Sequence, residues 1–462
     1  MKNTLFDKED FMFDNRYLFS LAMPLMADTA LSVAVGVADT MMVAQAGEAA
    51  VSGVSCMGSI QNLFIYLLMA FATGGSVVAS QLLGMKQEER ARKSVKILFY
   101  LTLSFAIITS SLFLVFREEI IKAIFGKIEE DVFYSTVSYS IPIMISMPAY
   151  ALISSANALC RSEGNSKVTM LVSIIINAVN IVGNAIFLFV FNLGALGVGI
   201  SSCISRYVGA AIMLIYVSDK KKNQLYLPEP FKFDFDWKCC SLILDQAIPV
   251  AIEKSLFHIG KIIISSTIAG FGTATIAAFA VFGNIETVID IPGTAFSLSS
   301  ITIIGQCCGG KRYDEATYCS KRILLYSYLL MWCTSSLCFL SIPNIIKLYS
   351  LSDEAVAIAV KVIRIDCINR AITWPLAFVL PNILHGAGDA KTVMVVAVLD
   401  MWICRVILAR ILGVKLGLGL LGTQMGMWAD WIVRVIVFVP LFASGRWKRK
   451  GIALNEKVNA TL

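Results

Sequence analysis

RSEGNSKVTM, residues 161–170, and HGAGDAKTVM, residues 385–394, are two versions of one stretch, 224 positions apart. Three more pairs keep nearly this separation: SQLLGMK (80–86) with GQCCGGK (305–311), AMPL (22–25) with AIPV (247–250), and LGALG (193–197) with LGLLG (418–422). One such match arises easily by chance, but a series in the same order indicates a duplicated chain. We therefore expect two equivalent halves.

The composition indicates an integral membrane protein. Hydrophobic residues make up 57% of the chain and charged residues 15%, whereas a soluble domain carries about a quarter charged residues. Apolar runs of about 20 residues cross a hydrocarbon core as helices. The predicted fold is all-α with twelve spans: 17–44, 55–83, 95–116, 133–160, 169–192, 196–218, 245–270, 275–307, 322–343, 357–384, 392–412 and 420–443.

Each half of the duplication holds six spans. Because six is even, both halves enter the membrane from the same side, so they are parallel repeats around an axis along the membrane normal. This architecture places a cavity between two lobes that rock to give alternating access. The predicted units are an N-terminal lobe (1–218), a cytoplasmic linker (219–241), a C-terminal lobe (242–443) and a cytoplasmic tail (444–462).

The basic residues of the loops lie mostly on one side. The side that holds both termini carries 25 of them, and the opposite loops carry only Arg117, Lys122, Lys127, Lys347 and Lys415. The positive-inside rule places both termini in the cytoplasm of a cell (plasma or inner) membrane. This bias accounts for the net charge of +7, so we expect no nucleic-acid partner. The twelve cysteines form no CxxC motif, and we expect no metal centre, cofactor or enzymatic activity.

Polar residues form one stripe on the first span. Asp28, Ser32 and Asp39 are spaced i, i+4 and i+11, which places them on one helix face. Acids inside a membrane are rare and usually mark ion or substrate pathways, so we favour a functional role for Asp39. Pro24 is a candidate hinge because its ring displaces a helix hydrogen bond.

Amides and hydroxyls follow in the fifth and sixth spans. Asn177, Asn180 and Asn184 share one face of the span 169–192, and Ser201, Ser202 and Ser205 lie in the span 196–218. Together with Asp39 they predict an oxygen-rich pocket for a small cation or a proton. For Asn177 and the serines, hydrogen bonding that only holds helices together is the favoured alternative.

The second half has charged residues of its own. Glu286 and Asp290 form an i, i+4 pair, and Glu253 and Lys261 lie in the span 245–270. These four residues either bind cationic substrates at a cavity wall or form an ion-pair network that sets only packing, and both interpretations stay open. Asp28, Asn157 and Asn177 complete the predicted substrate cavity.

The ordered set of motifs resembles the multidrug and toxic compound extrusion (MATE) family over nearly the whole chain. The resemblance is carried by Pro24 with Asp39, ASQLLGMKQEERARKS, ALCRSEGNSKVTM, NAVNIVGNAIFLF, LGALGVGISSCIS, AIPVAIEKSLFHIGKIIIS, AGFGTATIAAFAVFGNIETVIDIPG and ILHGAGDAKTVM. It implies V-shaped lobes that export large, often cationic compounds against an inflow of protons or sodium. It also implies a cation site at Asp39, Asn180, Asn184 and Ser202.

Two departures from the family pattern concern the coupling ion. Asn184 stands where the family often has an aspartate, and Trp374 stands where some sodium-coupled members have an acid. We therefore favour protons, with Na⁺ at Asp39, Asn180 and Asn184 as the alternative. Structurally varied cationic amphiphiles, exported by a monomer in the lipid bilayer, are the expected substrates.

Three other functions compete with this one. A lipid or lipid-linked oligosaccharide flippase shares the broad architecture, but it usually needs a cationic cavity for a pyrophosphate headgroup. A membrane enzyme lacks support because no nucleophile–base pair or metal constellation is evident. A channel is disfavoured because a duplicated two-lobe unit suits alternating access.

Overall fold

The computed structural model describes residues 12–126, 128–227, 236–349 and 351–461. The first lobe extends from residue 15 to residue 218. Its helices are α1 (Asn15–Ala44), α2 (Glu48–Gly84), α3 (Glu88–Val115), α4 (Arg117–Phe125), α5 (Glu130–Ile145), α6 (Met147–Ser162), α7 (Ser166–Ala185), the π-helical segment η2 (Ile186–Val190) and α8 (Gly194–Ser218).

The second lobe and a terminal helix follow. Their elements are α9 (Trp237–Ala269), α10 (Thr273–Ile289), α11 (Ile291–Gly309), α12 (Tyr313–Ile346), α13 (Asp353–Trp374), η3 (Pro375–Val379), α14 (Leu380–Gly386), α15 (Ala390–Asp400), η4 (Met401–Leu408), η5 (Ile411–Lys415), α16 (Gly419–Ala443) and α17 (Arg446–Thr461).

The predicted twelve spans are confirmed. In the described part of the chain, nine helices are long and apolar enough to cross a membrane, and α5 with α6, bent by 47°, forms a tenth crossing. The other two crossings are α9 and the run from α13 to α14. Both contain several charged residues, for example Glu253 in α9 and Asp366 in α13, which lower their hydropathy.

Prolines explain several breaks within the crossings. Pro292 is the second residue of α11, directly after α10 ends at Ile289, and Pro375 opens the π-helical η3. Pro142 and Pro148 flank the bend between α5 and α6. A proline ring displaces a backbone hydrogen bond of the preceding turn, so each position interrupts or bends the helix. Pro24, by contrast, lies buried inside an uninterrupted α1.

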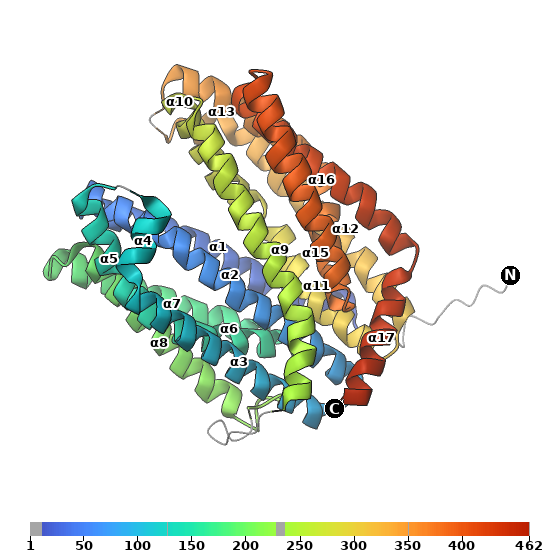
Figure 1. Ribbon diagram of the computed structural model, residues 1–462. Helices are drawn as coiled ribbons and strands as arrows, with labels where there is room; N and C mark the ends of the chain where they lie inside the picture. Colours follow the sequence, from blue (N-terminus) through green and yellow to red (C-terminus); the bar gives the residue numbers. More distant parts are fainter. Residues whose placement is uncertain (1–11, 127, 228–235, 350, 462) are drawn as a thin grey trace.

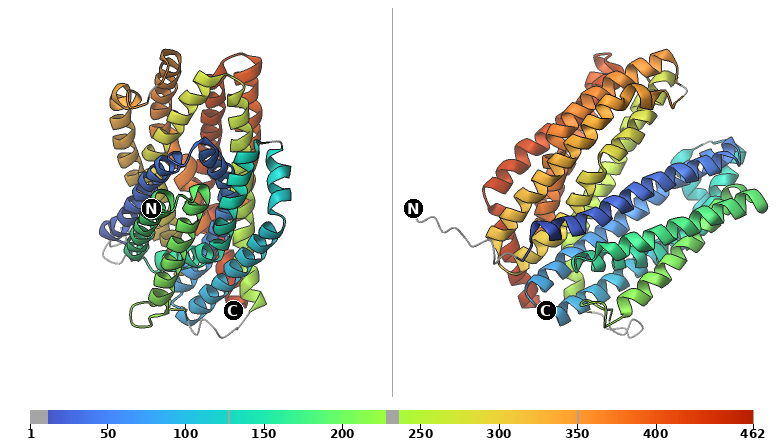
Figure 2. Two further views of the ribbon diagram at one scale, coloured as in Figure 1. Left: turned by 90° about the vertical axis from the view of Figure 1, so that its left-hand side faces the viewer. Right: turned by 180° about the vertical axis from the view of Figure 1, so that it is seen from behind.

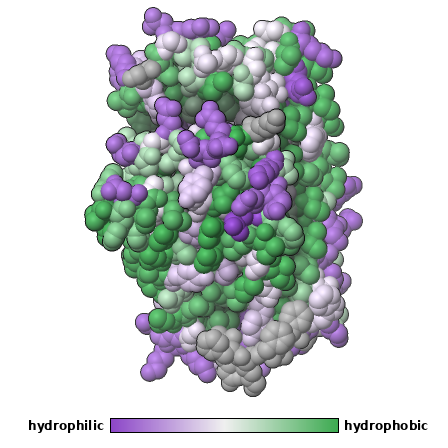
Figure 3. All heavy atoms as spheres, turned by 60° about the vertical axis from the view of Figure 1, so that its left-hand side comes forward, coloured by the Kyte–Doolittle hydropathy of each residue, from purple (hydrophilic) through white to green (hydrophobic). Residues whose placement is uncertain are grey.

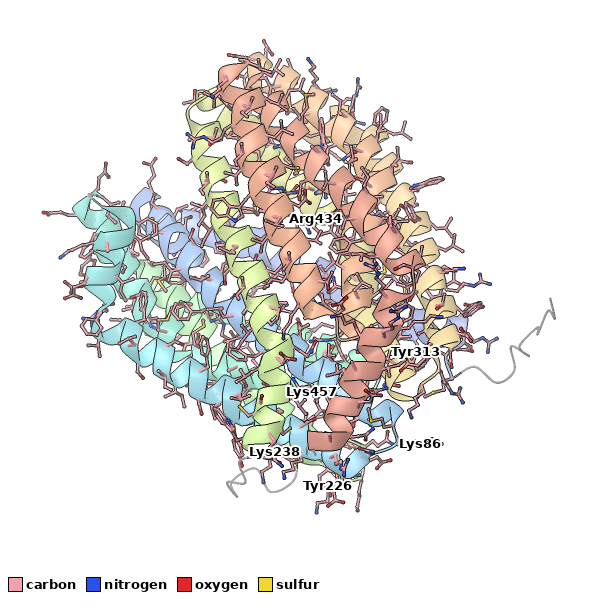
Figure 4. The ribbon with its side chains drawn as sticks, turned by 45° about the vertical axis from the view of Figure 1, so that its right-hand side comes forward. Lys86, Tyr226, Lys238, Tyr313, Arg434 and Lys457 are labelled. Atoms are coloured by element: carbon pink, nitrogen blue, oxygen red, sulfur yellow. The ribbon has the colours of Figure 1, made fainter. Side chains whose placement is uncertain are left out.

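The two lobes form a V. They converge at one end, where α17 also lies, and diverge toward the other (Figures 1 and 2). Most of the surface between the polar ends is apolar, as a bilayer requires (Figure 3). Lys86, Lys238 and Lys457 gather at the narrow end, whereas Arg434 lies well inside the second lobe (Figure 4).

At the narrow end the lobes meet through α2, which packs against α9 and α11. Matching glycines make this close approach possible, because a Cβ on Gly84 would overlap the carbonyl oxygen of Gln306 and a Cβ on Gly309 that of Gln81. The two glutamines also cross between the lobes. Gln81 Nε2 donates to the Gly386 carbonyl (3.5 Å), and Gln306 Nε2 donates to the Ser162 carbonyl (2.6 Å).

The linker packs against the first lobe. Leu225 and Leu227 are buried, and Arg92 Nε donates to the Gln224 carbonyl at 2.8 Å. The middle of the linker, 228–235, lies outside the described residues.

The predicted tail is an ordered helix, α17. Its Trp447 and Val458 are buried, Asn455 Nδ2 donates to the Cys308 carbonyl (2.7 Å), and Gln87 of the first lobe donates to Asn459 (3.1 Å). α17 therefore bridges both lobes at the narrow end.

Candidate functional site

Asp39 lies half-buried on α1 and faces α7. Asn184 Nδ2 donates to Asp39 Oδ1 at 2.8 Å. In the orientation that satisfies both ends of the Asn180 amide, its nitrogen donates to Asp39 Oδ1 (3.0 Å) and Oδ2 (3.2 Å), while its oxygen accepts from Ser202 Oγ (3.1 Å). The structure thus brings Asp39, Asn180, Asn184 and Ser202 together. Their ion-binding role stays a prediction.

Close packing of α7 and α8 holds the amides in place. Ser201 Oγ donates to the Asn180 carbonyl at 2.6 Å, and Gly183 has no room for a Cβ because Ser201 lies against it. Asn184 is fully buried and Asn180 nearly so. The two amides therefore have little freedom to turn away from the carboxylate.

A second polar contact joins α1 and α7 along the same face. Ser173 hydrogen-bonds to Asp28, and Asn177 Nδ2 donates to Ser173 Oγ at 3.5 Å. Both α1–α7 pairs, 28 with 173 and 39 with 184, are 145 positions apart, as expected for parallel helices in constant register. Ser173 therefore links Asp28 to Asn177. Asp28 is about three helix turns from Asp39 along α1, whereas Asn177 lies within about one turn of Asn180 along α7.

The predicted charged residues of the second lobe lie in ion-pair networks. Arg370 uses all three guanidinium nitrogens: Nε contacts Asp366 (2.7 Å), Nη1 contacts Asp290 (2.5 Å) and Nη2 contacts Glu286 (3.0 Å). Lys261 approaches Glu286 only to 4.0 Å. Glu286 and Asp290 thus take part in an ion-pair network, and a substrate-binding role for them stays a prediction.

A second ion-pair network joins α15 and η4 to α16. Asp430 forms ion pairs with Arg405 (3.1 Å) and Arg434 (3.0 Å), and Arg434 also reaches Asp400 (3.3 Å). Glu253 is buried and paired with His385 (3.2 Å) and Lys254 (3.3 Å). Glu253 is thus held by contacts within the second lobe, and a substrate-binding role for it stays a prediction.

Sequence reasoning missed the acids Asp366, Asp400 and Asp430. The signal that could have revealed two of them is an acid four residues before an arginine in an apolar helix. Asp366 with Arg370 and Asp430 with Arg434 both have this spacing, which pairs opposite charges on one helix face.

A cavity of about 380 Å³ opens in the second lobe beside these networks, and Tyr66 of α2 also lines it. Its walls are largely aromatic, and the polar residues on them include Lys261, Glu286, Asp290, Arg370 and Arg405. Asn157, half-buried on α6, is not among the residues that line it. Asp28, Asn177 and Glu253 are also absent from its wall.

A larger groove of about 990 Å³ separates the lobes on one side. α1 contributes Ser32, Gly36 and Thr40 to its wall, and α10 and α12 form the opposite side. This groove is the opening of the V toward its wide end.

Three ligand-type side chains meet at the narrow end. Potential metal-binding atoms of Cys307, Glu315 and Cys319 lie within 4.8 Å of one another. Both carboxylate oxygens of Glu315 are engaged, however, one by the Phe13 N–H (3.0 Å) and one by Arg312 (3.2 Å). We assign the cluster to anchoring the chain before α1.

Comparisons with known proteins match this architecture. The sequence profile of the family described as MatE matches residues 24–186 and 249–411, one match in each half of the chain. The chain belongs to the MatE family. The two matches begin 225 positions apart, which agrees with the duplication read from the sequence.

Its similarity to individual MATE proteins extends over nearly the full length. An uncharacterized transporter of Bacillus subtilis, YisQ, is 29% identical over 94% of this chain and 96% of its own. A probable multidrug resistance protein of Thermotoga maritima, NorM, is 23% identical over 98% of this chain and 97% of its own. A solved outward-facing multidrug resistance MATE family transporter of the MOP superfamily superposes with a TM-score of 0.84 at 16% identity, covering 95% and 96% of the two chains.

These findings confirm the predicted family and fold. The protein is a multi-pass membrane transporter of small molecules, and its relatives are named for multidrug resistance.

Proposed function

We propose that this MATE protein is a secondary active antiporter that exports organic compounds in exchange for protons. The observation that carries the proposal is the setting of Asp39. Within the described residues, its contacts are neutral amides, and no lysine or arginine forms an ion pair with it. A carboxylate inside a membrane without a cationic partner is suited to take up and release a proton.

The orientation of the V supports the direction of transport. The narrow end holds both the linker and α17, and basic residues gather there (Figure 4). By the positive-inside rule this end faces the cytoplasm, so the wide end opens to the outside of the cell membrane. Labelling of a cysteine placed at Lys220 tests this topology in intact cells. Reaction with an impermeant reagent from outside would overturn it.

Protons suit the cluster better than sodium. Both Asn184 and Asn180 direct amide nitrogens toward Asp39, whereas a metal cation needs oxygens from every side. Hydrogen-bond donors stabilise the charged carboxylate without competing for its proton. When Asp39 is protonated, the same amides can turn their oxygens toward it, so the cluster accommodates both states.

Coupling follows when the two states of Asp39 favour different conformations. An ion drives a conformational change only through its different affinity for the two states. Protonation from the outside removes a charge between α1 and α7 and weakens the hydrogen bonds that join them. We propose that α1 then bends at Pro24 and repacks. This movement displaces substrate outward and closes the outer side of the V.

A flippase is less well supported. The cavity in the second lobe carries the basic residues Lys261, Arg370 and Arg405, but Arg370 is bound by three acids and Arg405 pairs with Asp430. This arrangement leaves no concentrated positive charge of the kind that a pyrophosphate headgroup requires.

Gradient experiments with purified protein test the proposed coupling. In proteoliposomes, an imposed proton gradient should drive uphill transport of ethidium, and an imposed sodium gradient at constant pH should not. Transport driven only by sodium would contradict proton coupling. An absence of transport under both gradients would contradict antiport itself.

A further inference from the structure

The cavity in the second lobe has walls suited to a flat ring system. Phe257, Phe279, Phe282, Trp374, Phe378 and Trp431 all line it, and its volume of about 380 Å³ lies in the range of small-molecule sites. Aromatic side chains stack on planar ligands with little conformational entropy cost. The walls therefore favour aromatic compounds but do not decide the charge of the ligand.

The acids of the cavity wall are already engaged by contacts within the protein. Glu286 and Asp290 each bind a separate nitrogen of Arg370, and Asp366 behind them binds the third. Arg370 is fully buried and stacks over the Trp431 ring at 4.9 Å. A cationic ligand that approaches these two carboxylates would therefore meet the positive charge of the guanidinium that they already share.

Unused hydrogen-bond donors lie on the same wall. Arg405 Nε and Trp431 Nε1 have no partner among the described residues, although the two side chains are only 6% and 2% exposed. Gln424 Oε1, an acceptor on the same wall, also lacks a partner among the described residues. Buried donors almost always have a partner, because an unsatisfied one costs about 1–3 kcal/mol. Two of them in one cavity wall point to an acceptor group that comes from a ligand.

One exposed cation completes the arrangement. The Lys261 side chain is 53% exposed and is held by Glu286 only at 4.0 Å, the weakest ion pair of the cavity. A lysine in this position can turn from Glu286 to a new anion with little loss of interaction free energy.

From these contacts we propose that the second-lobe cavity binds aromatic compounds that carry a carboxylate or a similar anionic acceptor group. The anionic group lies at Arg405 and Trp431, Lys261 covers it, and the ring system stacks on the aromatic walls. This inference rests on the proposed export function and names its substrate class. At this cavity it assigns anionic or zwitterionic substrates, in addition to the cationic compounds expected from the sequence.

A matched pair of dyes tests the proposal. Rhodamine 110 carries a free carboxylate, and rhodamine 123 is its methyl ester, so the two differ only in that group. Fluorescence anisotropy of each dye is measured with the purified protein in lipid nanodiscs, without any ion gradient. We expect rhodamine 110 to bind about tenfold more tightly than rhodamine 123, as for a charge-assisted hydrogen bond.

Variants test whether the selectivity for rhodamine 110 depends on the named residues. Lys261→Met should weaken rhodamine 110 about fivefold and leave rhodamine 123 unchanged. Trp431→Phe removes the N–H but keeps a ring, and should also weaken rhodamine 110 selectively. Lys254→Met, on the same helix as Lys261 but not among the cavity-lining residues, is the matched control and should change neither dye.

Equal or tighter binding of the ester, or equal weakening of both dyes by Lys261→Met, would overturn the inference. Those outcomes leave the antiport proposal standing, because uphill ethidium transport is measured separately. Failure of ethidium transport with the selective binding intact would remove the antiport proposal alone.

Discussion

The two lobes descend from one six-helix unit, yet they carry different kinds of polar chemistry, and at positions that do not correspond. Asp39 of α1 corresponds to Ile264 of α9, while Glu286 and Asp290 of α10 correspond to Gln61 and Ile65 of α2. The first lobe holds a carboxylate among neutral amides, and the second holds acids bound to arginines. Duplication preserved the backbone, and each copy acquired a different site.

The two sites differ in how easily their carboxylates can gain a proton. A carboxylate with neutral partners can gain a proton without breaking an ion pair, whereas one bound to arginine loses that partner's attraction. We infer that the first lobe responds to the ion and the second provides a fixed surface for substrate. Predictions that alter one lobe at a time test this division.

The largest effect is expected from Arg370→Met in the second lobe. It leaves three acids around a fully buried position without their shared cation. Breaking a buried ion pair in this way costs about 3–5 kcal/mol. The yield of monodisperse protein and its melting temperature in detergent should both fall sharply.

Two further variants isolate the cause of that loss. Adding Glu286→Gln and Asp290→Asn to Arg370→Met should recover part of the stability, because fewer acids then lack a partner. Arg370→Met protein as stable as wild type would show that the network is not structurally important.

A smaller effect is expected from Asn184→Ala in the first lobe. The change removes the 2.8 Å hydrogen bond to Asp39 while keeping the acid. Proton-driven ethidium transport should fall about tenfold, as for the loss of one hydrogen bond to a charged group. Thr169→Ala is the matched control, since Thr169 lies on the same helix and its hydroxyl donates to the Ser166 carbonyl of that helix at 2.7 Å. Equal losses in both variants would contradict a specific role for Asn184.

The smallest effect is expected at the narrow end, where Gln81 and Gln306 occupy equivalent positions of the two halves. Gln81→Ala and Gln306→Ala each remove one hydrogen bond between the lobes at the narrow end. Each should raise the alkylation rate of the buried Cys308 about threefold, with the exposed Cys333 as internal reference, measured by peptide mass spectrometry. No change in either variant would show that these bonds do not hold the narrow end closed.

The sequence was sufficient to predict the architecture because the bilayer allows few kinds of membrane-spanning structure. Spans of about 20 apolar residues and the repeat at offsets of 224 and 225 determine twelve crossings in two lobes. The Asp39 cluster was also accessible, because helical periodicity places Asn180 and Asn184 on one face and membrane acids are rare.

The partners of the second-lobe acids were not predictable in the same way. Glu286 and Asp290 were visible as an i, i+4 pair, but Arg370 lies 80 and more residues further along the chain. Periodicity relates residues within a helix, and the contacts between α10 and α13 depend on packing. For the same reason, the contacts of α17 with both lobes were not predictable from the sequence.

The most direct test of the account is uphill transport by Asp39→Asn protein in proteoliposomes. The amide has nearly the same shape as the acid but cannot change its charge. We predict that the variant folds, inserts and binds rhodamine 110 as the wild type does, and that a proton gradient no longer drives ethidium transport. Uphill transport by the purified variant at near wild-type rate would contradict the assignment of Asp39 as the coupling carboxylate.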